Sequence, residues 1–359
     1  MTSLSETQQG TRHPFQSNDQ IEIYKDKNTT TMNSIMTDSI MTDTINGVLE
    51  IPENLSIKQC PELYQAPVER CTLRECTNKG VLENMHPHKR DSRLDFAELG
   101  HHYFIDGIRH DELHYLSSTT FLGKFFKPFD GPLIVRMIMR GKRWMNDPTY
   151  RYYRMEESDI LGQWKQLGDD ACRLGSYFHI SAEYDCNLIP VLDDPTPAYQ
   201  QYLAFRADNP HLVPYRTEML IFDEKYRIVG SVDGIFKNLK TNKFLIIDWK
   251  RSKEIKRKGG DKGLFPIEHL RSNNLTKYSL QLSLYTFILE MNYGWDMEAS
   301  ALVVCHPNQD TCQYITAKYM KDEIQELLDY RLLGLYKNDI IDMPEDIKNA
   351  DIDWDSISL

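Results

Sequence analysis

The 359-residue sequence contains no uninterrupted apolar run of the roughly 20 residues that a membrane-spanning helix needs. Its first residues also lack the basic and apolar regions of a secretory signal. The seven cysteines are odd in number and irregularly spaced, which argues against a disulfide framework. We therefore expect a protein with no membrane association that works in a reducing compartment, either the cytoplasm or the nucleus.

The cysteines also give little support for a zinc site. Cys60, Cys71 and Cys76 lie close together in the sequence, but no CxxC pair accompanies them. Structural zinc sites usually draw their ligands from closely spaced pairs of this kind. The pattern therefore favours free thiols.

Acidic residues outnumber basic ones, and the formal net charge of −11 argues against a protein coated for nonspecific nucleic-acid binding. The charge is distributed unevenly, however. Residues 236–277 contain 12 Lys or Arg against 4 Asp or Glu, a local net charge of +8. Local potential steers a polyanion more than total charge does, so this stretch is a candidate DNA contact. A solvated loop is the simpler interpretation of the stretch taken alone.

Two apolar stretches, residues 228–236 and 244–249, flank a polar turn and predict a β-hairpin. Each carries an acidic residue where a buried strand should have none: Asp233 in the first and Asp248 in the second. Residues i and i+2 of a strand point to one face, so Asp248 and Lys250 should project together. Antiparallel pairing can also set Asp233 beside Asp248.

Two neighbouring carboxylates suit a hard cation such as Mg²⁺, which prefers oxygen ligands and retains several waters. An adjacent lysine could orient or deprotonate a bound water, or neutralise charge that builds on a phosphate. A buried Asp–Lys ion pair, with a second aspartate that caps a turn, would explain the same residues without catalysis. The hairpin alone supports both interpretations about equally.

The elements before the hairpin bring further polar residues. A long helix predicted over residues 156–187 carries His179 and Glu183 four residues apart, and therefore on one face. Gly175 lies one turn earlier, so another backbone or a ligand strand could approach closely there. The strand predicted next carries Glu218, isolated among apolar neighbours. Taken alone, His179 is more easily explained as a core histidine than as a ligand.

Two more helical patterns combine apolar and polar residues. Gln281 and Tyr285 share one face of an apolar helix over residues 277–294. A buried glutamine needs hydrogen-bond partners, which neighbouring backbone commonly supplies. Residues 132–154 predict a basic helix with several aromatic side chains. Such a surface can stack bases and touch phosphates, but aromatic packing onto a core explains the segment equally well.

The chain divides into four parts by composition and pattern. Residues 1–50 are polar, poor in aromatic side chains and locally repetitive, and they predict a disordered arm of low complexity. Residues 51–100 predict a partly ordered extension, and residues 101–337 a globular domain. Residues 338–359 are strongly acidic and predict a solvated tail, or a competitor for the basic stretch.

Four short motifs lie on these elements in order: GSYFHISAE (175–183), GSVD (230–233), DWK (248–250) and QLSLY (281–285). Each is weak alone, but together they resemble the RecB-like branch of the PD-(D/E)xK nuclease superfamily. The resemblance covers about residues 101–337 and is especially to lambda-exonuclease-like, YqaJ-like proteins of large DNA viruses. It implies an α/β fold with a restriction-endonuclease-like core, a mixed β-sheet flanked by helices, behind a disordered N-terminal arm.

The resemblance also implies a metal site for Mg²⁺ or Mn²⁺. Its ligands would come from the long helix and the hairpin: His179, Asp233, Asp248 and the carbonyl oxygen of Trp249. A second ion would bind Glu183 or Glu218, directly or through water. Lys250 would position the attacking water against the scissile phosphate.

Nucleic-acid contacts follow from the same resemblance. Gln281 and Tyr285 would contact the nucleic acid or support the site. The basic loop after the hairpin would guide DNA through Arg251, Lys253, Lys256, Arg257 and Lys258. No iron–sulfur cluster is expected, although some relatives have one, because Cys305 and Cys312 lack companions.

The resulting hypothesis is a metal-dependent deoxyribonuclease, most simply an exonuclease that acts on DNA ends in recombination, repair or genome processing. A structure-selective or nicking endonuclease would use the same site, and a non-catalytic DNA-binding module is the alternative from another class. The expected partners are DNA ends or single strands, together with a single-strand annealing or replication protein. If the protein is viral, it should act where the virus replicates in the host cell.

Overall fold

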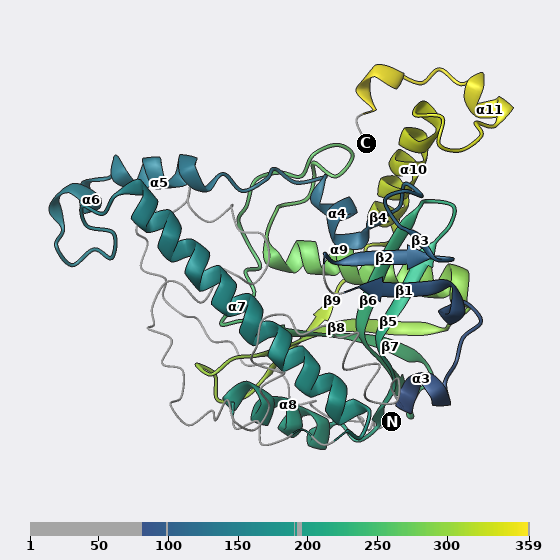
Figure 1. Cartoon of the computed structure of the whole chain (residues 1–359), viewed down its shortest axis with the longest axis horizontal. Coiled ribbons are helices and arrows are strands. Elements are labelled where there is room, and N and C mark those ends of the chain that lie inside the picture. The colour runs from purple at the N-terminus through teal and green to yellow at the C-terminus, as the bar shows by residue number, and fades with distance from the viewer. Residues whose placement is uncertain (1–80, 98–99, 190, 192–195, 358–359) are drawn as a thin grey trace, which may run out of the picture.

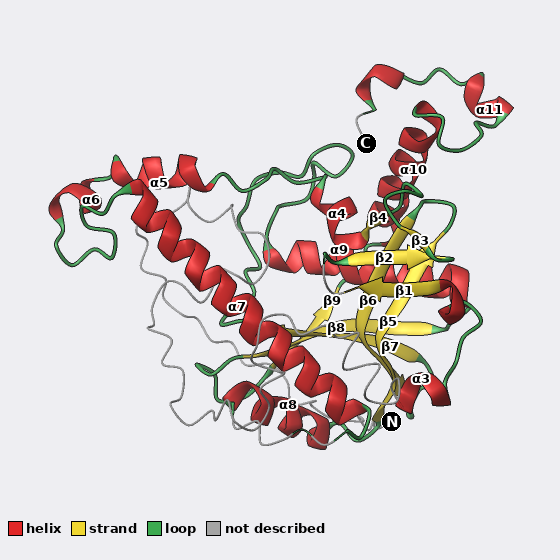
Figure 2. Ribbon diagram, in the orientation of Figure 1, coloured by secondary structure: helices red, strands yellow, loops and turns green. Residues whose placement is uncertain are grey.

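The computed structural model describes residues 81–97, 100–189, 191 and 196–357 (Figure 1). In this part of the chain a six-stranded mixed sheet has helices on both faces, and a small three-stranded sheet packs at one end (Figure 2). The predicted fold class, a mixed β-sheet flanked by helices, is confirmed. The predicted arm and most of the extension after it lie outside the described residues. None of the described helices is long and apolar enough to cross a membrane.

The large sheet is built around β6 (Ile228–Asn238). β5 (Leu212–Asp223) runs antiparallel to β6 along its whole length. The opposite edge of β6 pairs first with the short parallel β4 (Leu116–Ser117) and then with the antiparallel β7 (Phe244–Arg251). Between these two pairings, residues 230–233 of β6 pair with no strand of the described chain on that edge. The sheet is therefore forked at this point.

The remaining strands extend the sheet beyond β7. β8 (Met297–Cys305) pairs with β7 in parallel, and β9 (Gln313–Ala317) pairs antiparallel with β8. A parallel pair requires a crossover connection, which the loop of residues 252–273 and α9 (Asn274–Ile288) provide. A π-helical turn at Leu289–Tyr293 ends the crossover.

One face of the sheet is covered by α7 (Glu157–Cys186) and α8 (Pro197–Asp208). The largest side chain between these layers is Trp249, only 2% exposed, whose ring lies 5.0 Å from that of Tyr202. Phe178 of α7 belongs to the same apolar cluster. The long helix predicted over residues 156–187 is thus present with nearly the predicted bounds, because its apolar face finds this layer.

The other face is covered by α4 (Ser118–Gly123), α9 and α10 (Lys321–Lys337). Ser117 caps α4 by accepting a hydrogen bond from the backbone N–H of Thr120 at 3.2 Å. α9 is apolar on nearly all sides because it is enclosed between the sheet and the neighbouring helices.

The small sheet consists of β1 (Leu94–Ala97), β2 (His102–Ile105) and β3 (Ile108–Arg109), all antiparallel. It packs on β5 and β6 through a separate apolar cluster. A short helix, α3 (Val81–Met85), precedes it and lies against β5. The sequence places the start of the globular domain at residue 101. This boundary falls inside the small sheet, because β1 lies before it, β2 lies after it, and the two strands pair.

Residues 132–154, predicted as one basic helix, form two short helices followed by turns. α5 (Gly131–Met139) is capped by Asp130, and α6 (Lys142–Asn146) begins after Gly141. Figure 1 shows both at the N-terminal end of α7, away from the sheet. The single predicted helix is therefore wrong, and the chain breaks at Gly141.

The acidic tail is only partly solvated. It contains the short α11 (Glu345–Lys348) and then a 3₁₀ turn at Trp354–Ser356. Ile357 is 6% exposed within the apolar cluster that includes α10, and its carbonyl accepts a hydrogen bond from Lys337 Nζ at 2.8 Å. The prediction of a solvated tail is wrong at this end, because an apolar residue anchors it.

The central position of Trp249 leads to a stability prediction. Replacing Trp249 with Ala should lower the free energy of unfolding by about 3–5 kcal/mol, because the cavity left between the sheet, α7 and α8 cannot fully collapse. Urea denaturation followed by circular dichroism measures the change. The Trp249→Phe variant should lose less, and equal losses for the two variants would contradict the packing role assigned to the indole.

Candidate metal centre

Three acidic residues form one row across the large sheet at its fork. The pairing of β5 with β6 sets Glu218 opposite Asp233. The pairing of β6 with β7, if continued by one residue beyond Gly234, would set Asp233 opposite Asp248. The strands diverge there instead, and the backbone N–H of Trp249 donates to Asp233 Oδ2 at 3.2 Å. The divergence leaves the Asp233 carboxylate open to groups from the helices.

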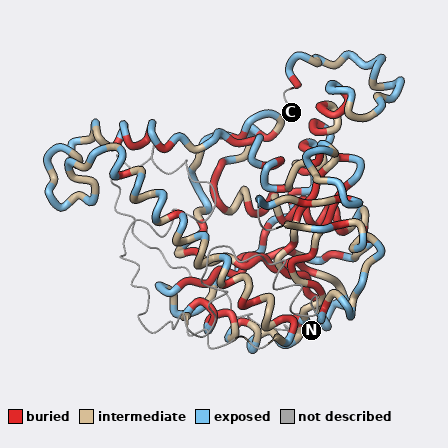
Figure 3. The backbone as a smooth tube through the Cα atoms, viewed as in Figure 1, coloured by how far each residue is buried: buried red, intermediate tan, exposed pale blue. Residues whose placement is uncertain are grey.

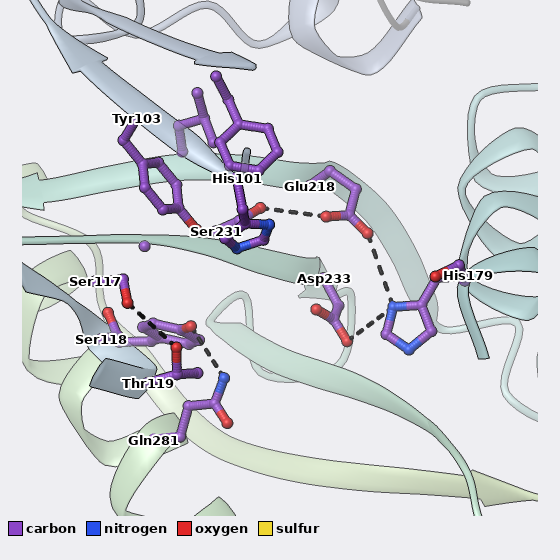
Figure 4. Close-up of a pocket in the computed structure, with 15 residues that line it drawn as sticks. His101, Tyr103, Ser117, Ser118, Thr119, His179, Glu218, Ser231, Asp233 and Gln281 are labelled. Carbon is purple, nitrogen blue, oxygen red and sulfur yellow. Dashed lines mark hydrogen bonds and ion pairs between the residues drawn. The ribbon is translucent and has the colours of Figure 1, made fainter. Parts of the chain in front are cut away.

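His179 of α7 completes a group of three potential metal ligands. Its Nδ1 lies 3.5 Å from Asp233 Oδ2 and 3.9 Å from Glu218 Oε1 (Figure 4). Ser231 Oγ donates to the second Glu218 oxygen at 3.2 Å. One ligand atom from each of His179, Glu218 and Asp233 lies within 4.8 Å of the others. The arrangement brings together three residues that are far apart in the sequence.

The protonation equilibria of this group reflect crowded, buried charge. Burial raises the pKa of Asp233, the nearby Asp248 carboxylate raises it further, and the net value is about 6 against an ordinary 3.8. Burial lowers the pKa of His179, but the Asp233 and Glu218 carboxylates outweigh it, so the net shift is upward. The concentrated negative charge contributes to both upward shifts, beside the burial of Asp233, and a bound cation would offset that charge.

The chemistry of the donor set fits a divalent metal ion. Carboxylate oxygens suit Mg²⁺ and Mn²⁺, and an imidazole nitrogen is a common additional ligand for Mn²⁺ and later transition metals. The group of His179, Glu218 and Asp233 could therefore hold a metal ion. Of the residues that the resemblance assigns to metal binding, His179 and Asp233 fall in this group, and so does Glu218, which it assigns to a second ion as the alternative to Glu183.

Asp248 and Lys250 lie on the other face of β7 from Trp249. Leu245 and Trp249 pack toward α7 and α8, so strand alternation turns Asp248 and Lys250 toward α9. The two project together, as predicted, with Lys250 Nζ 2.8 Å from Asp248 Oδ2. Lys250 Nζ also lies 5.0 Å from the ring centroid of Tyr278. Asp248 is therefore outside the three-residue group and forms an ion pair instead.

The ion pair keeps Lys250 protonated. Burial lowers its pKa, but the Asp248 and Asp233 carboxylates more than reverse this, so the pKa of Lys250 is above its ordinary value. Asp248 is only 3% exposed, so its charge needs a partner that the lysine supplies. A lysine in this state donates hydrogen bonds and positive charge and does not accept a proton at neutral pH.

Three further residues of the predicted site occupy less direct positions. Glu183 lies one turn beyond His179 on α7 and is not part of the three-residue group. Trp249 reaches the site through its backbone N–H, whereas its indole is buried on the far face. No atom of the described chain comes within 4 Å of a Cβ placed on Gly175. Of the two possibilities that the sequence leaves open at Gly175, no other backbone packs there within these residues, and the open space still admits a ligand strand.

The backbone of Glu218 is unusual. Its φ is +45°, in the left-handed region that residues other than glycine rarely adopt, although it lies inside a long strand. Such a conformation costs on the order of 1–3 kcal/mol and persists where surrounding structure enforces it. Side chains held this way cluster at functional sites, which agrees with the position of the Glu218 carboxylate beside His179.

The three-residue group lines a cavity of about 300 Å³. Gln281 and Tyr285 of α9 line it too, and Gln281 Nε2 donates to Tyr285 Oη at 3.0 Å. A Cβ at Gly230 would lie 2.5 Å from Ser118 Oγ and 2.9 Å from Tyr285 Cε1. The glycine of the GSVD motif is therefore required because α4 and α9 approach β6 closely.

The sequence did not identify several residues that line this cavity. Aromatic side chains of the small sheet form one wall, and hydroxyl groups from β4, α4 and β6 form another (Figure 4): Phe96, His101, Tyr103, Ser117, Ser118, Thr119 and Ser231. The rings of Phe96 and His101 meet edge to face with centroids 4.8 Å apart. Apart from Ser231, which lies in the GSVD motif, these residues have no distinctive spacing, so no local sequence signal marks them.

The basic loop after β7 is more ordered than a solvated loop. Ile255 and Ile267 are buried in the main apolar cluster. Two of the five predicted DNA contacts are exposed, Arg257 and Lys258. The other three are partly buried: Arg251, Lys253 and Lys256. Arg257 and Lys258 are therefore the members of this set best exposed to a ligand.

Comparison with protein-family profiles and with curated proteins gives no match. Solved structures give weak likenesses. The protein SSO0001 is 16% identical with a TM-score of 0.27, over 61% of this chain and 76% of its own. A protein of Eubacterium rectale, named as a candidate exonuclease, is 10% identical with a TM-score of 0.28, over 67% of this chain and 90% of its own. At such TM-scores neither likeness carries an argument, so the functional assignment depends on the site itself.

The raised pKa of Asp233 predicts that this carboxylate destabilises the metal-free protein. Because its pKa is raised on folding, Asp233 binds a proton more tightly in the folded state than in the unfolded state. The stability that protonated Asp233 contributes is therefore fully present below pH 3.8 and is lost as pH rises through about 6. The Asp233→Asn variant should thus be more stable than wild type by on the order of 1–3 kcal/mol near pH 8 in EDTA. Urea melts near pH 8 and near pH 4 test this; the gain should vanish at the lower pH.

Metal binding should weaken as pH falls, because protons compete for the same ligands. Asp233 must be ionised and His179 neutral to bind an ion, and both pKa values are raised. We expect the increase in melting temperature caused by Mn²⁺ to be large near pH 8 and to shrink steeply through about pH 6. A metal-induced shift that is unchanged over this range, or that persists in the His179→Ala variant, would contradict the assigned ligands.

Proposed function

We propose that this protein is a metal-dependent deoxyribonuclease of the PD-(D/E)xK type that hydrolyses phosphodiester bonds at DNA ends. The observation that carries the proposal is the convergence of His179, Glu218 and Asp233 beside the Asp248–Lys250 ion pair, at the fork of the large sheet. Ligands for a divalent cation and a protonated lysine are the parts that phosphodiester hydrolysis requires.

The metal would be Mg²⁺ or Mn²⁺, held by His179, Glu218 and Asp233. When bound, such an ion supplies positive charge to a phosphate oxygen and lowers the pKa of a water ligand. Asp248 contributes by holding Lys250 in place, and both lie one strand away from Asp233. This division of roles differs from the one that the resemblance implies, in which Asp248 is itself a ligand.

Lys250 serves as a hydrogen-bond donor in this proposal. Because its pKa is raised, it carries a proton at neutral pH and can orient an attacking water or stabilise charge on the scissile phosphate. Proton removal from the water by Lys250, the other role considered from the sequence, is disfavoured for the same reason. Tyr285, whose pKa is raised by burial, stays neutral and can donate its hydroxyl hydrogen to a phosphate oxygen.

Action at DNA ends is supported by the wall of the cavity. The small sheet and its β1–β2 turn place Tyr103 and His101 on the side of the cavity away from His179 (Figure 4), and Phe96 lines the cavity too. Aromatic side chains can stack on a terminal base, and a wall of this kind suits a strand that ends in the cavity. A role in recombination, repair or genome processing, with a single-strand annealing or replication protein as partner, belongs to the proposal through the resemblance to virus-encoded enzymes.

Cleavage of end-labelled linear DNA tests the proposed activity. With Mg²⁺ or Mn²⁺, wild type should shorten the DNA progressively from an end, and the Lys250→Ala variant should be at least about 100-fold slower while it still binds DNA. Lys321→Ala, an exposed substitution at the first residue of α10, is the matched control and should cleave normally.

The same assay separates the alternatives. Cutting of covalently closed circular DNA, or discrete internal products, would replace the exonuclease with an endonuclease that uses the same site. Absence of cleavage of single-stranded, blunt and recessed DNA with both metals would leave a non-catalytic DNA-binding module. RNA offered in competition with DNA tests the choice of polymer.

A further inference from the structure

A basic surface lies far from the metal centre. Residues 131–155, which comprise α5, α6 and the turns that follow, are called the basic lobe here. Their only acidic residue is Asp147, and their six basic residues are all exposed: Arg136, Arg140, Lys142, Arg143, Arg151 and Arg154. The lobe thus has a net charge of +5 in a chain with a net charge of −11. Figure 3 shows most of its backbone as exposed or intermediate.

Aromatic side chains fix the basic lobe to α7. Trp164 Nε1 of α7 donates to Tyr152 Oη at 2.8 Å, and Trp144 Nε1 donates to the carbonyl of Met155 at 3.1 Å. The rings of Phe129 and Trp164 have centroids 6.1 Å apart. The aromatic residues therefore serve the internal packing of the lobe, and its cations remain on the surface.

Few carboxylates neutralise these cations. Arg136 lies 3.5 Å from Glu157, in the first turn of α7, and Arg143 lies 3.5 Å from Asp147. Arg140, Lys142 and Arg151 form no ion pair with any carboxylate among the described residues; the Arg151 guanidinium lies 5.4 Å from the ring centroid of Tyr152. Arg154 has no such ion pair among these residues either, but its Nε donates to the carbonyl of Met145 at 3.4 Å. Arg140, Lys142 and Arg151 are therefore the three chosen to test contact with a polyanion.

A second cavity, of about 470 Å³, lies between the metal centre and the chain that leads into the basic lobe. It shares Thr119 and Gln281 with the cavity at the metal centre. Its lining includes Lys127 and Phe129, which directly precede α5, and Lys277 of α9. Basic and aromatic side chains thus continue from the site toward the lobe.

The length of α7 sets the separation between the two regions. The basic lobe packs at the first turns of α7, and His179 lies 22 residues after Glu157 on the same helix. A rise of 1.5 Å per residue places them about 33 Å apart along the axis. B-form DNA rises about 3.4 Å per base pair, so this length corresponds to about ten base pairs.

We propose that the basic lobe binds the phosphate backbone of the DNA duplex about ten base pairs from the strand end held at the metal centre. The inference rests on the proposed function and adds to it the form of the substrate, an end that is followed by at least one turn of duplex. Charge complementarity and continuity with the site through the second cavity favour this occupant. Rigid attachment to α7 would make the lobe a fixed second contact.

Binding of DNA hairpins with one open end tests the proposal. Stems of about 8 and about 20 base pairs fall on either side of the expected contact. The variant Arg140→Gln, Lys142→Gln, Arg151→Gln is compared with a control of equal charge, Lys89→Gln, Lys321→Gln, Lys348→Gln, whose lysines are exposed outside both the basic lobe and the basic stretch of residues 236–277. Both sets are made in the Lys250→Ala background so that the probe is not consumed, and circular dichroism confirms that each variant is folded.

We expect the control to bind the long stem on the order of tenfold or more tightly than the short stem, and the lobe variant to lose most of this difference. For the long stem, log K falls linearly with the logarithm of the salt concentration. This slope should be less steep by about 2.7 for the lobe variant than for the control, since each of the three lost phosphate contacts contributes about 0.9. Affinity for the short stem should be equal in both. Equal affinities of the control for both stems, or equal behaviour of lobe variant and control, would overturn the proposal.

Cleavage distinguishes this proposal from the proposed function. With Lys250 intact, the lobe variant should cleave the short stem at the wild-type rate. It should cleave the long stem more slowly than wild type does, and this difference should be larger at about 0.2 M salt than at low salt. Failure of wild type to cleave either stem with both metals would refute the nuclease assignment, and the length dependence of binding would still decide the role of the lobe.

Discussion

The site depends on the compensation of buried negative charge at the fork of the large sheet. Glu218, Asp233 and Asp248 come from three adjacent strands and meet where β6 loses its partner on one edge. Burying carboxylates costs on the order of several kcal/mol per ion unless cations or donors accompany them. Lys250 compensates Asp248, and His179 faces the other two. Burial and the remaining excess of negative charge together raise the pKa of Asp233, and this crowding is what makes the group a candidate cation site.

The rest of the fold holds this arrangement in place. Trp249 locks β7 against α7 and α8 and thereby turns its neighbours Asp248 and Lys250 to the opposite face. Gly230 lets α4 and α9 approach β6, which brings Gln281 and Tyr285 to the cavity. The long α7 supplies His179 and, at its other end, carries the basic lobe. A metal centre and a distant charged surface are therefore positioned by the same rigid helix.

Local patterns in the sequence were sufficient where side chains act within one element. The hairpin of β6 and β7, the bounds of α7, and the joint projection of Asp248 and Lys250 follow from periods of two and 3.6 residues. Patterns failed where a distant partner decides the outcome. Ile357 is buried because it packs with the cluster that includes α10, and residues 132–154 break at Gly141, although their composition favours one helix. The aromatic wall of the cavity was missed because Phe96 and His101 carry no periodic signal.

By itself, the sequence determined which residues are chemically capable: isolated acids on apolar strands, a lysine two residues from an aspartate, and a histidine on a long helix. The tertiary structure decided how they are grouped. Glu218 became a member of the metal centre because β5 sets it opposite Asp233, with a backbone φ of +45°. Asp248 became the partner of Lys250 because strand alternation turns both side chains toward α9, and there Asp248 still lies close enough to Asp233 to raise the pKa of that carboxyl. Strand register and divergence are long-range properties, and no stretch of sequence around either residue contains them.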